Sequence, residues 1–438
     1  MRSRCRAALA PAGLWRGVPW CAALVVSALW GAPVPAQARL PPPLPDTGLI
    51  GYDDDGLRIH SADGRRQLKI RGYVAADARF LLSDTSDSPA NTLAIRRSRI
   101  LFDVNMNPWL AFRLLFDVAA PAGPTPLADA YVDVGLPGTW WIRAGKQKTP
   151  VGLERYFSIS TQLLAERSIA SNLNASRDEG ILLTGRVIAG TDLSVGVFNG
   201  APDGATTQDA DANDAKDFTY RLWLHPLRRI VRGAEQGIGL AFNGSAGIEH
   251  GSASAGSQLP TFKTPAQLIF FGYNDAALVR AAGLHSRSGL LGYAFFDRWG
   301  ATAEWAGTSQ RVVRGGALGT VPVRSWLVTG QYVLTGEPSA VEGIGPATPF
   351  DPGKGHWGAF QLGARAASVA VGREAFTQFA DSAVAARQAT ELGVALNWYI
   401  TRATKAQFAY EHTTFRGGAR VGDRQAERYI QIRWQAYF

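Results

Sequence analysis

Apolar and polar residues alternate along much of the chain, in segments of roughly ten residues parted by clusters of Gly, Pro, Asp and Asn. Successive side chains of a β-strand point to opposite faces of a sheet, so this pattern predicts strands with one apolar and one polar face. The last segment, 427–438, shows the pattern clearly. Ile432 and Trp434 fall on its apolar face, and Gln431 and Arg433 fall on the other.

The hairpin predicted over 95–118 places arginines on its polar face. Arg97, Arg99 and Arg113 lie in the phase opposite to the apolar residues and are expected to point into the interior. Arg96 is out of that phase. A charged side chain on the lipid face costs about 2–4 kcal/mol at mid-membrane and little near the interface, so we expect Arg96 at the rim.

The same alternation predicts the remaining strands. They fall at 57–60, 68–74, 128–134, 140–145, 180–186, 193–198, 218–224, 238–248, 277–286, 289–296, 301–313, 324–334, 357–371, 389–400 and 403–412. The polar phase of these strands adds Lys69, Arg71, Arg143 and Arg221 to the cations expected in the interior.

The pattern indicates how the chain meets a membrane. After residue 38 there is no apolar run of about eighteen residues, so membrane-spanning helices are not expected. In lipid every backbone amide and carbonyl must be paired within the protein, and a closed barrel achieves this. The sequence therefore predicts an all-β fold, a transmembrane antiparallel β-barrel. At about twenty-five residues a strand, sixteen strands fit the chain, and fourteen or eighteen stay open as alternatives.

One stretch, about 146–179, interrupts the alternation between two predicted strands. A loop of roughly thirty-five residues is uncommon inside a compact chain and is usually functional. It carries Lys146, Lys148, Arg155 and Arg167. We therefore predict a constriction loop that folds into the lumen and sets the width and the charge of a pore.

The N-terminus predicts the compartment. Residues 1–38 combine a basic start, a short apolar core and an Ala-Gln-Ala cleavage site, as a secretory signal peptide does. A proline-rich lead-in at 39–56 precedes the barrel expected at 57–438. Removing the signal takes both cysteines and four of the 45 basic residues but none of the 36 acids, so the net charge falls to +5. We expect a disulfide-free, multi-pass protein of the bacterial outer membrane.

Several stretches together resemble a known family. The stretch 145–155 (GKQKTPVGLER) is similar to the start of the constriction loop in the phosphate-selective porin O/P family. The arginine-bearing strand pair and the end of the loop also resemble that family, as do three stretches further on, and these lie at 96–99, 112–117, 166–168, 177–180, 329–337, 357–365 and 396–399. The resemblance implies a sixteen-stranded barrel, usually trimeric, that passes phosphate or related anions.

Arginine is suited to anion selection because its planar guanidinium stays charged and presents a fork of donors that matches phosphate oxygens. Conduction also requires that each site release its ion. We predict a pore constriction with anion-binding residues Lys146, Lys148, Arg155, Arg167, Arg97, Arg99 and Arg113, and an anion path along Lys69, Arg71, Arg143 and Arg221. A structural ion pair is the competing interpretation for each arginine, above all for Arg177 beside Asp178 and Glu179.

The expected function is passive diffusion of small anions, phosphate or polyphosphate first. A pore for another anionic solute, such as a dicarboxylate, is the nearest alternative. A structural or adhesive outer-membrane barrel without transport is the alternative of another class. Outer-membrane lipid and two further copies of the chain are the other expected partners, and nucleic acid is not expected.

No enzymatic motif is complete, so we expect neither an enzyme nor a cofactor. The histidines show no paired ligand spacing, and no metal site is predicted. The acidic outer loop, 203–217, starts like a calcium loop. Asp214 stands where that loop needs Gly and Tyr220 where it needs Glu, so a solvated loop is favoured over divalent-ion binding.

Overall fold

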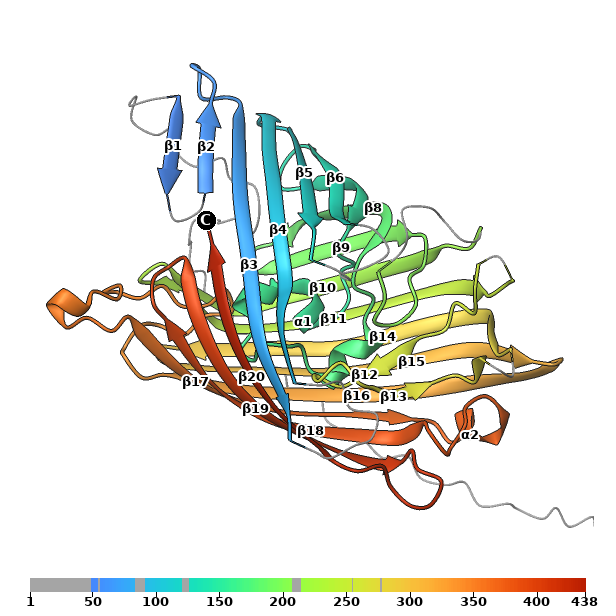
Figure 1. The fold of residues 1–438 in the computed structure, drawn as a ribbon. Helices are drawn as coiled ribbons and strands as arrows, with labels where there is room; N and C mark the ends of the chain where they lie inside the picture. Colours follow the sequence, from blue (N-terminus) through green and yellow to red (C-terminus); the bar gives the residue numbers. More distant parts are fainter. Residues whose placement is uncertain are drawn as a thin grey trace, which may run out of the picture. The chain divides into compact units, whose positions relative to one another are not determined.

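The computed structural model describes residues 49–53, 56–82, 91–119, 126–206, 214–253, 255–275 and 278–438. The predicted signal peptide and most of the proline-rich lead-in lie outside these ranges, as does the middle of the acidic loop. Within them, sixteen antiparallel strands form a closed barrel (Figure 1). The predicted fold class and strand number are therefore confirmed.

The strands of the barrel follow one another around its wall in chain order. They are β3 (Gln67–Leu81), β4 (Thr92–Asn107), β5 (Leu110–Asp117), β6 (Leu127–Gly135), β7 (Trp141–Gln147), β8 (Asp178–Ile188), β9 (Thr191–Phe198), β10 (Asp217–Val231), β11 (Ala234–His250), β14 (Arg280–Phe296), β15 (Trp299–Arg314), β16 (Ala317–Val333), β17 (Ala359–Val371), β18 (Ala386–Tyr399), β19 (Thr404–Gly417) and β20 (Glu427–Tyr437). Pairing of β20 with β3 closes the ring.

Two short hairpins lie outside this ring of strands. β1 (Ile50–Asp53) pairs with β2 (Gly56–His60), which in turn pairs with the first residues of β3. β12 (Thr261–Lys263) and β13 (Ile269–Gly272) form a separate two-stranded sheet within the connection between β11 and β14. No helix among the described residues is long and apolar enough to cross a membrane.

The period-two pattern of the sequence becomes the two faces of the wall. In β20, Trp434 is 52% exposed on the outer face, whereas the neighbouring Arg433 is fully buried on the inner face. Gln431 is buried with it, as predicted, and so is Gln435. An apolar outer band and a polar interior are what a barrel in lipid requires.

One pair of predicted strands is a single element. The segments 277–286 and 289–296 are predicted as two separate strands, and this prediction is wrong, because β14 runs unbroken from Arg280 to Phe296. Arg287 and Ser288 stay in the ladder with β11. The guanidinium of Arg287 is buried inside the barrel and bound to carboxylates. This polar position can therefore stay within the strand.

Connections fill much of the interior of the barrel. The β7–β8 connection, 148–177, meets the β11–β14 connection, 251–279, in one buried cluster where Ile169 packs with Phe262 and Phe271. Apolar side chains that face inward would be costly in an open water-filled tube. Here they are covered by the second loop, so the lumen is narrowed by two connections that enter at the same end.

A third connection enters from the opposite end. In an antiparallel barrel, successive connections lie at alternate ends of the barrel. The β16–β17 connection, 334–358, therefore lies at the end that holds the tight β8–β9 turn. It reaches the β7–β8 loop, because Val341 packs against the buried cluster that contains Leu153. Val341, the constriction-loop residues around Leu153 and several side chains of the wall line a cavity of about 60 Å³.

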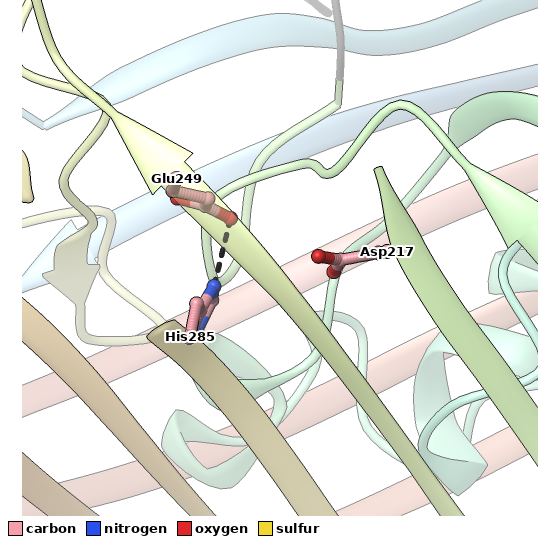
Figure 2. A group of neighbouring side chains, drawn as sticks. All are labelled: Asp217, Glu249 and His285. Carbon is pink, nitrogen blue, oxygen red and sulfur yellow. Dashed lines mark hydrogen bonds and ion pairs between the residues drawn. The ribbon is translucent and has the colours of Figure 1, made fainter. Parts of the chain in front are cut away.

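The inner wall also holds buried clusters of charged side chains. One of them brings together Asp217 of β10, Glu249 of β11 and His285 of β14 (Figure 2). Each of these residues is at most 2% exposed. Among the described residues, this is the group with the side chains to hold a metal ion.

Candidate pore constriction

The loop between β7 and β8 contains only short helical turns. They are α1 (Leu153–Tyr156), η1 (Ile159–Thr161) and η2 (Ile169–Leu173). Such short turns have no amphipathic period, which explains why the sequence pattern shows no element here. Contacts with the wall therefore determine the path of the loop.

Two glycines of the wall admit leucines of the loop. A Cβ atom at Gly363 of β17 would lie 2.5 Å from Cγ of Leu163, and one at Gly393 of β18 would lie 2.5 Å from Cδ2 of Leu164. Both distances are too short for non-bonded carbon atoms, so a side chain at either position would force the leucine to shift. Leu164 is completely buried as a result.

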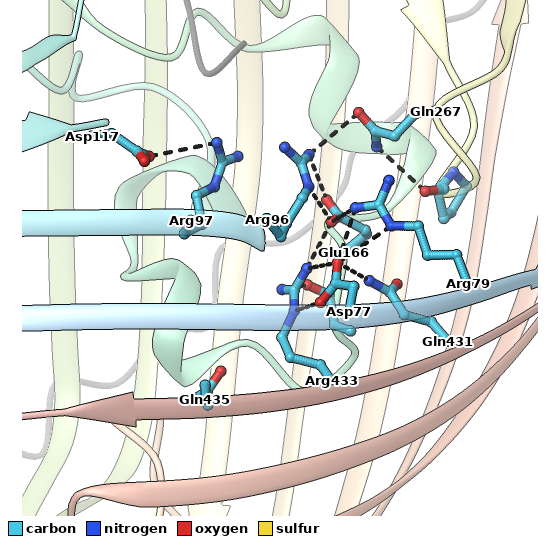
Figure 3. Close-up of polar contacts among 12 residues, drawn as sticks. Asp77, Arg79, Arg96, Arg97, Asp117, Glu166, Gln267, Gln431, Arg433 and Gln435 are labelled. Atoms are coloured by element: carbon cyan, nitrogen blue, oxygen red, sulfur yellow. Dashed lines mark hydrogen bonds and ion pairs between the residues drawn. The ribbon is translucent and has the colours of Figure 1, made fainter. Parts of the chain in front are cut away.

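Glu166 is the main ionic anchor of the loop (Figure 3). Its Oε1 accepts from Nε of Arg96 at 2.7 Å and from Nη2 of Arg433 at 2.8 Å, and Nη2 of Arg79 lies 3.4 Å away. Arg433 also binds Asp77 through two nitrogens, which fixes its orientation. Burial opposes ionisation, but the charges of Arg96 and Arg433 hold the pKa of Glu166 well below its usual range.

The position of Arg96 corrects the prediction that it lies at the rim. In the ladder between β3 and β4, Ala75 pairs with Arg97 while Ala76 pairs with Ile95, so Arg96 is an extra residue in a β-bulge. A bulge places two successive residues opposite one, and it shifts the side-chain phase. Arg96 therefore joins Arg97 on the inner face, where it binds Glu166.

A second anchor comes from the C-terminal half of the wall. Arg365 of β17 donates through Nη1 to the carbonyl of Glu166 at 2.8 Å and binds the carboxylates of Glu391 and Glu411. Glu391 in turn accepts the backbone N–H of Ile169 at 2.9 Å. The sequence analysis assigned no role in holding the loop to Arg365, Arg433 or Glu166. Glu166, placed next to Arg167 in the resembling stretch, was the available signal.

Three of the predicted loop cations are bound only to backbone carbonyls among the described residues. Nζ of Lys148 donates to the carbonyls of Tyr156 at 2.8 Å and Phe157 at 3.0 Å. Nε of Arg155 donates to a carbonyl at 3.0 Å, and Nε of Arg167 donates to another at 2.8 Å. All three cations are half-buried. Carbonyls orient these groups without neutralising them, so their charge stays available to a solute.

Two arginines of β4 add to this group of cations. Nε of Arg99 lies 2.9 Å and Nη1 of Arg97 lies 3.5 Å from the same oxygen of Asp117, so one carboxylate serves two guanidinium groups. Nε of Arg97 is buried without a hydrogen-bond partner. Arg97 and Arg99 both lie close enough to act electrostatically on Arg167. We call Lys148, Arg155, Arg167, Arg97 and Arg99 the cation cluster.

The charges of the cation cluster act on Lys148. Burial and the neighbouring charges of Arg177 and Arg167 lower the pKa of Lys148 well below that of a free lysine. Each charge in such a group disfavours the next unless an anion is present to compensate. The cations of the cluster therefore repel one another.

The other predicted constriction residues have acidic partners of their own. Nζ of Lys146, in β7, lies 3.6 Å from Oε1 of Glu179. Arg113 binds Asp103, which it shares with Arg71. Compensation by carboxylates makes these residues weaker candidates for binding a solute.

The remaining residues of the predicted path lie on the inner wall and differ in their pairing. Lys69 stands opposite Asp103 across the ladder between β3 and β4. Arg143 binds a carboxylate at 2.6 Å and lies over the ring of a tyrosine. Arg221 lies over the ring of Tyr156, 3.7 Å from its centroid, so the path touches the constriction loop there.

Arg177 follows the structural interpretation, although with another partner. Its Nε donates to Oδ1 of Asp129 at 2.6 Å, an acid that is distant in the sequence. Arg177 is 8% exposed and Asp129 is 5% exposed. A buried pair between the loop and β6 holds the end of the loop against the wall.

Comparison with solved structures supports the fold. An outer-membrane channel DcaP of Acinetobacter baumannii matches with a TM-score of 0.54 at 10% identity, over 87% of this chain and 99% of that chain. OmpF of Salmonella typhi, in a complex with daunomycin, matches with a TM-score of 0.51 at 12% identity, over 87% and 100%. The trimer form of OmpT, an outer-membrane protein of Vibrio cholerae, gives 0.50 at 11%, over 85% and 100%.

The sequence itself matches a family model. No protein with a curated description matches it at a significant level. The model for phosphate-selective porins O and P, in contrast, matches residues 68–438, which include all sixteen barrel strands except the first residue of β3. Together with the barrel fold, this match makes the protein a channel of the bacterial outer membrane. The chain belongs to the phosphate-selective porin O and P family.

Proposed function

We propose that the protein is a passive channel that prefers small anions, with phosphate or polyphosphate as its first candidate solutes. One observation carries this proposal. In the cation cluster, Lys148, Arg155 and Arg167 are oriented by carbonyls and face two arginines that share a single carboxylate. The positive charge of the group is only partly compensated, so the group attracts anions and repels cations.

In the proposed mechanism, the anion exchanges its hydrating water molecules for hydrogen-bond donors of the protein. A guanidinium offers several N–H groups in one plane, and charge-assisted hydrogen bonds to an anion are roughly twice as strong as neutral ones. Passage also needs release, which Asp117 promotes by competing for Arg97 and Arg99. Paired arginines such as Arg71 and Arg143 would extend a series of weaker sites along the wall.

The reversal potential in a salt gradient tests the preference. In planar bilayers with a KCl gradient, we expect a reversal potential of the sign for chloride, and a clear cation preference would contradict the proposal. The double variant Lys148→Gln and Arg167→Gln should move the reversal potential toward that of an unselective pore. The control is Lys354→Gln, because Lys354 is exposed and pairs with Asp351 near the end of the barrel opposite the loop.

Phosphate block distinguishes the solutes. If phosphate occupies the cation cluster, millimolar phosphate reduces the chloride current, and the Lys148/Arg167 double variant is less sensitive. The family description favours phosphate. Block by a dicarboxylate such as succinate, without block by phosphate, would favour the other anionic solute.

We further propose that three copies of the chain assemble into a trimer. We also propose that the barrel transports solutes and carries no catalytic activity. The trimer form of the Vibrio cholerae protein supports the first point. A structural or adhesive barrel is the contrasting possibility. Liposomes that contain the protein should swell in an isosmotic anion solution faster than empty ones, and equal rates would favour that contrasting role.

A further inference from the structure

A buried group of metal-ligand residues lies outside the cation cluster. Asp217 opens β10, and Gly247 of β11 stands between it and His285 of β14 in register, with Glu249 two residues further along β11. A Cβ atom at Gly247 would lie 1.9 Å from Oδ1 of Asp217. The absence of a side chain at Gly247 therefore lets Asp217 and His285 approach each other across the central strand.

The three side chains converge, and two of their oxygens are unused. One ligand atom from each of Asp217, Glu249 and His285 lies within 4.8 Å of the others (Figure 2). Oδ1 of Asp217 and Oε2 of Glu249 are buried and have no hydrogen-bond partner. An unpaired buried carboxylate oxygen is costly, so each such atom calls for an explanation.

Neighbouring charges do not supply that explanation. Arg287 donates to Oδ2 of Asp217 at 3.0 Å and to Oδ1 of Asp203 at 2.6 Å, and neither donation reaches the two unused oxygens. Nδ1 of His285 contacts Oε1 of Glu249 at 2.8 Å. Nε2 of His285 also lies 3.3 Å from Oδ1 of Asp203, so a protonated imidazole balances one carboxylate. Three carboxylates then face two cations, Arg287 and His285, and one negative charge remains inside the wall. Binding of a metal to the imidazole would displace its proton.

We propose that Asp217, Glu249 and His285 bind one divalent transition-metal cation, for which Zn²⁺ is the probe. Imidazole nitrogen together with carboxylate oxygen is a donor set that Zn²⁺ accepts. A divalent ion would compensate the remaining charge and use the unpaired oxygens. A metal bound by two carboxylates and one imidazole on three adjacent strands fixes the spacing of those strands.

The β9–β10 connection links the proposed metal site to the constriction loop. Asp203 of that connection is tied to Arg287 at the edge of the site. The connection also braces the end of the constriction loop, because Ser176 N–H donates to the carbonyl of Ala205 at 2.7 Å and Gly204 N–H donates to that of Asn174 at 3.1 Å. Bound metal would therefore stabilise the loop whose cations set the selectivity.

Zinc titration of the untagged, folded protein tests the proposal. After treatment with EDTA, Zn²⁺ is added either to the folded channel or during refolding, since a site this buried can load as the chain folds. Bound zinc is measured by elemental analysis and its affinity by calorimetry. We expect about one equivalent for each chain, and a dissociation constant at least tenfold larger in Glu249→Gln and His285→Ala.

His250→Ala is the matched control. His250 follows Glu249 in β11 but is exposed, so its loss should leave zinc binding unchanged. Equal binding by the wild type, Glu249→Gln and His285→Ala, or no binding by the wild type after refolding with zinc, would overturn the proposal. The heat-modification midpoint provides a second measurement, since zinc should raise it in the wild type and not in Glu249→Gln. These measurements do not involve anion preference, so the metal site and the proposed transport function can fail separately.

Discussion

At the scale of residues, the site depends on which partner each cation has. Arg113 and Arg143 bind carboxylates, whereas Lys148, Arg155 and Arg167 bind carbonyls. A carboxylate cancels the charge that an anion would meet, and a carbonyl only directs it. The sequence could predict that cations gather here, because the inward phase of Arg97 and Arg99 can be counted along their strand, while Lys148, Arg155 and Arg167 lie in the stretch that interrupts the alternation. It could not predict which of them stay uncompensated, since their partners come from distant segments.

The lysine of the cation cluster gives a prediction for pH. Because burial and nearby cations lower the pKa of Lys148, its ammonium loses its proton at a lower pH than a free lysine does. Raising the pH through this range removes one charge, so anion preference should decline at a lower pH than the titration of a free lysine would give. Arginine stays charged throughout, so Lys148→Arg should keep the preference nearly constant. Reversal potentials between pH 6 and pH 10 measure the difference, and identical profiles for the two proteins would contradict this assignment.

At the scale of elements, the strands were predictable and the loop was not. Alternation specifies a strand and its inner face, as in β20 and the hairpin of β4 and β5. It fails where the ladder is irregular. A strict two-residue alternation does not reveal the bulge that turns Arg96 inward. It also fails for the constriction loop, whose path depends on glycines of strands far along the chain. In the sequence, Gly363 and Gly393 are merely residues that disfavour a strand. The structure shows that they make room for Leu163 and Leu164.

Those glycines give a prediction about the position of the loop. Val at Gly393 would overlap with Leu164, and overpacking of a well-packed site costs about 1–3 kcal/mol. We expect Gly393→Val to displace the loop, to widen the distribution of single-channel conductance and to lower the midpoint of heat unfolding. A Cβ atom at Gly330 meets nothing within 4 Å, so Gly330→Ala is the matched control in the neighbouring wall. Unchanged conductance in Gly393→Val would show that the loop does not depend on this contact.

At the scale of the whole molecule, the barrel closes by pairing β20 with β3, and connections from both ends pack inside it. The count of sixteen strands followed from chain length, and the family resemblance agreed with it. The contribution of the β16–β17 connection could not be read from the sequence. Its residues show no alternation and few charges, and nothing local indicates that Val341 packs beside Leu153 of the constriction loop.

Shortening that connection separates the width of the pore from its charge. Residues 339–348 bring Val341 and Gly343 against the constriction loop, and Gly343 lies near Thr161. They include Glu342 but no lysine or arginine. Replacing them with two glycines should therefore raise single-channel conductance while leaving anion preference similar or slightly larger, because the cation cluster is anchored separately through Glu166 and Arg365. A fall in anion preference together with higher conductance would mean that this connection also holds the cations in place. The Lys148/Arg167 double variant should show the opposite combination, a lost preference with a smaller change in conductance, so the two variants measured side by side assign width and charge to different loops.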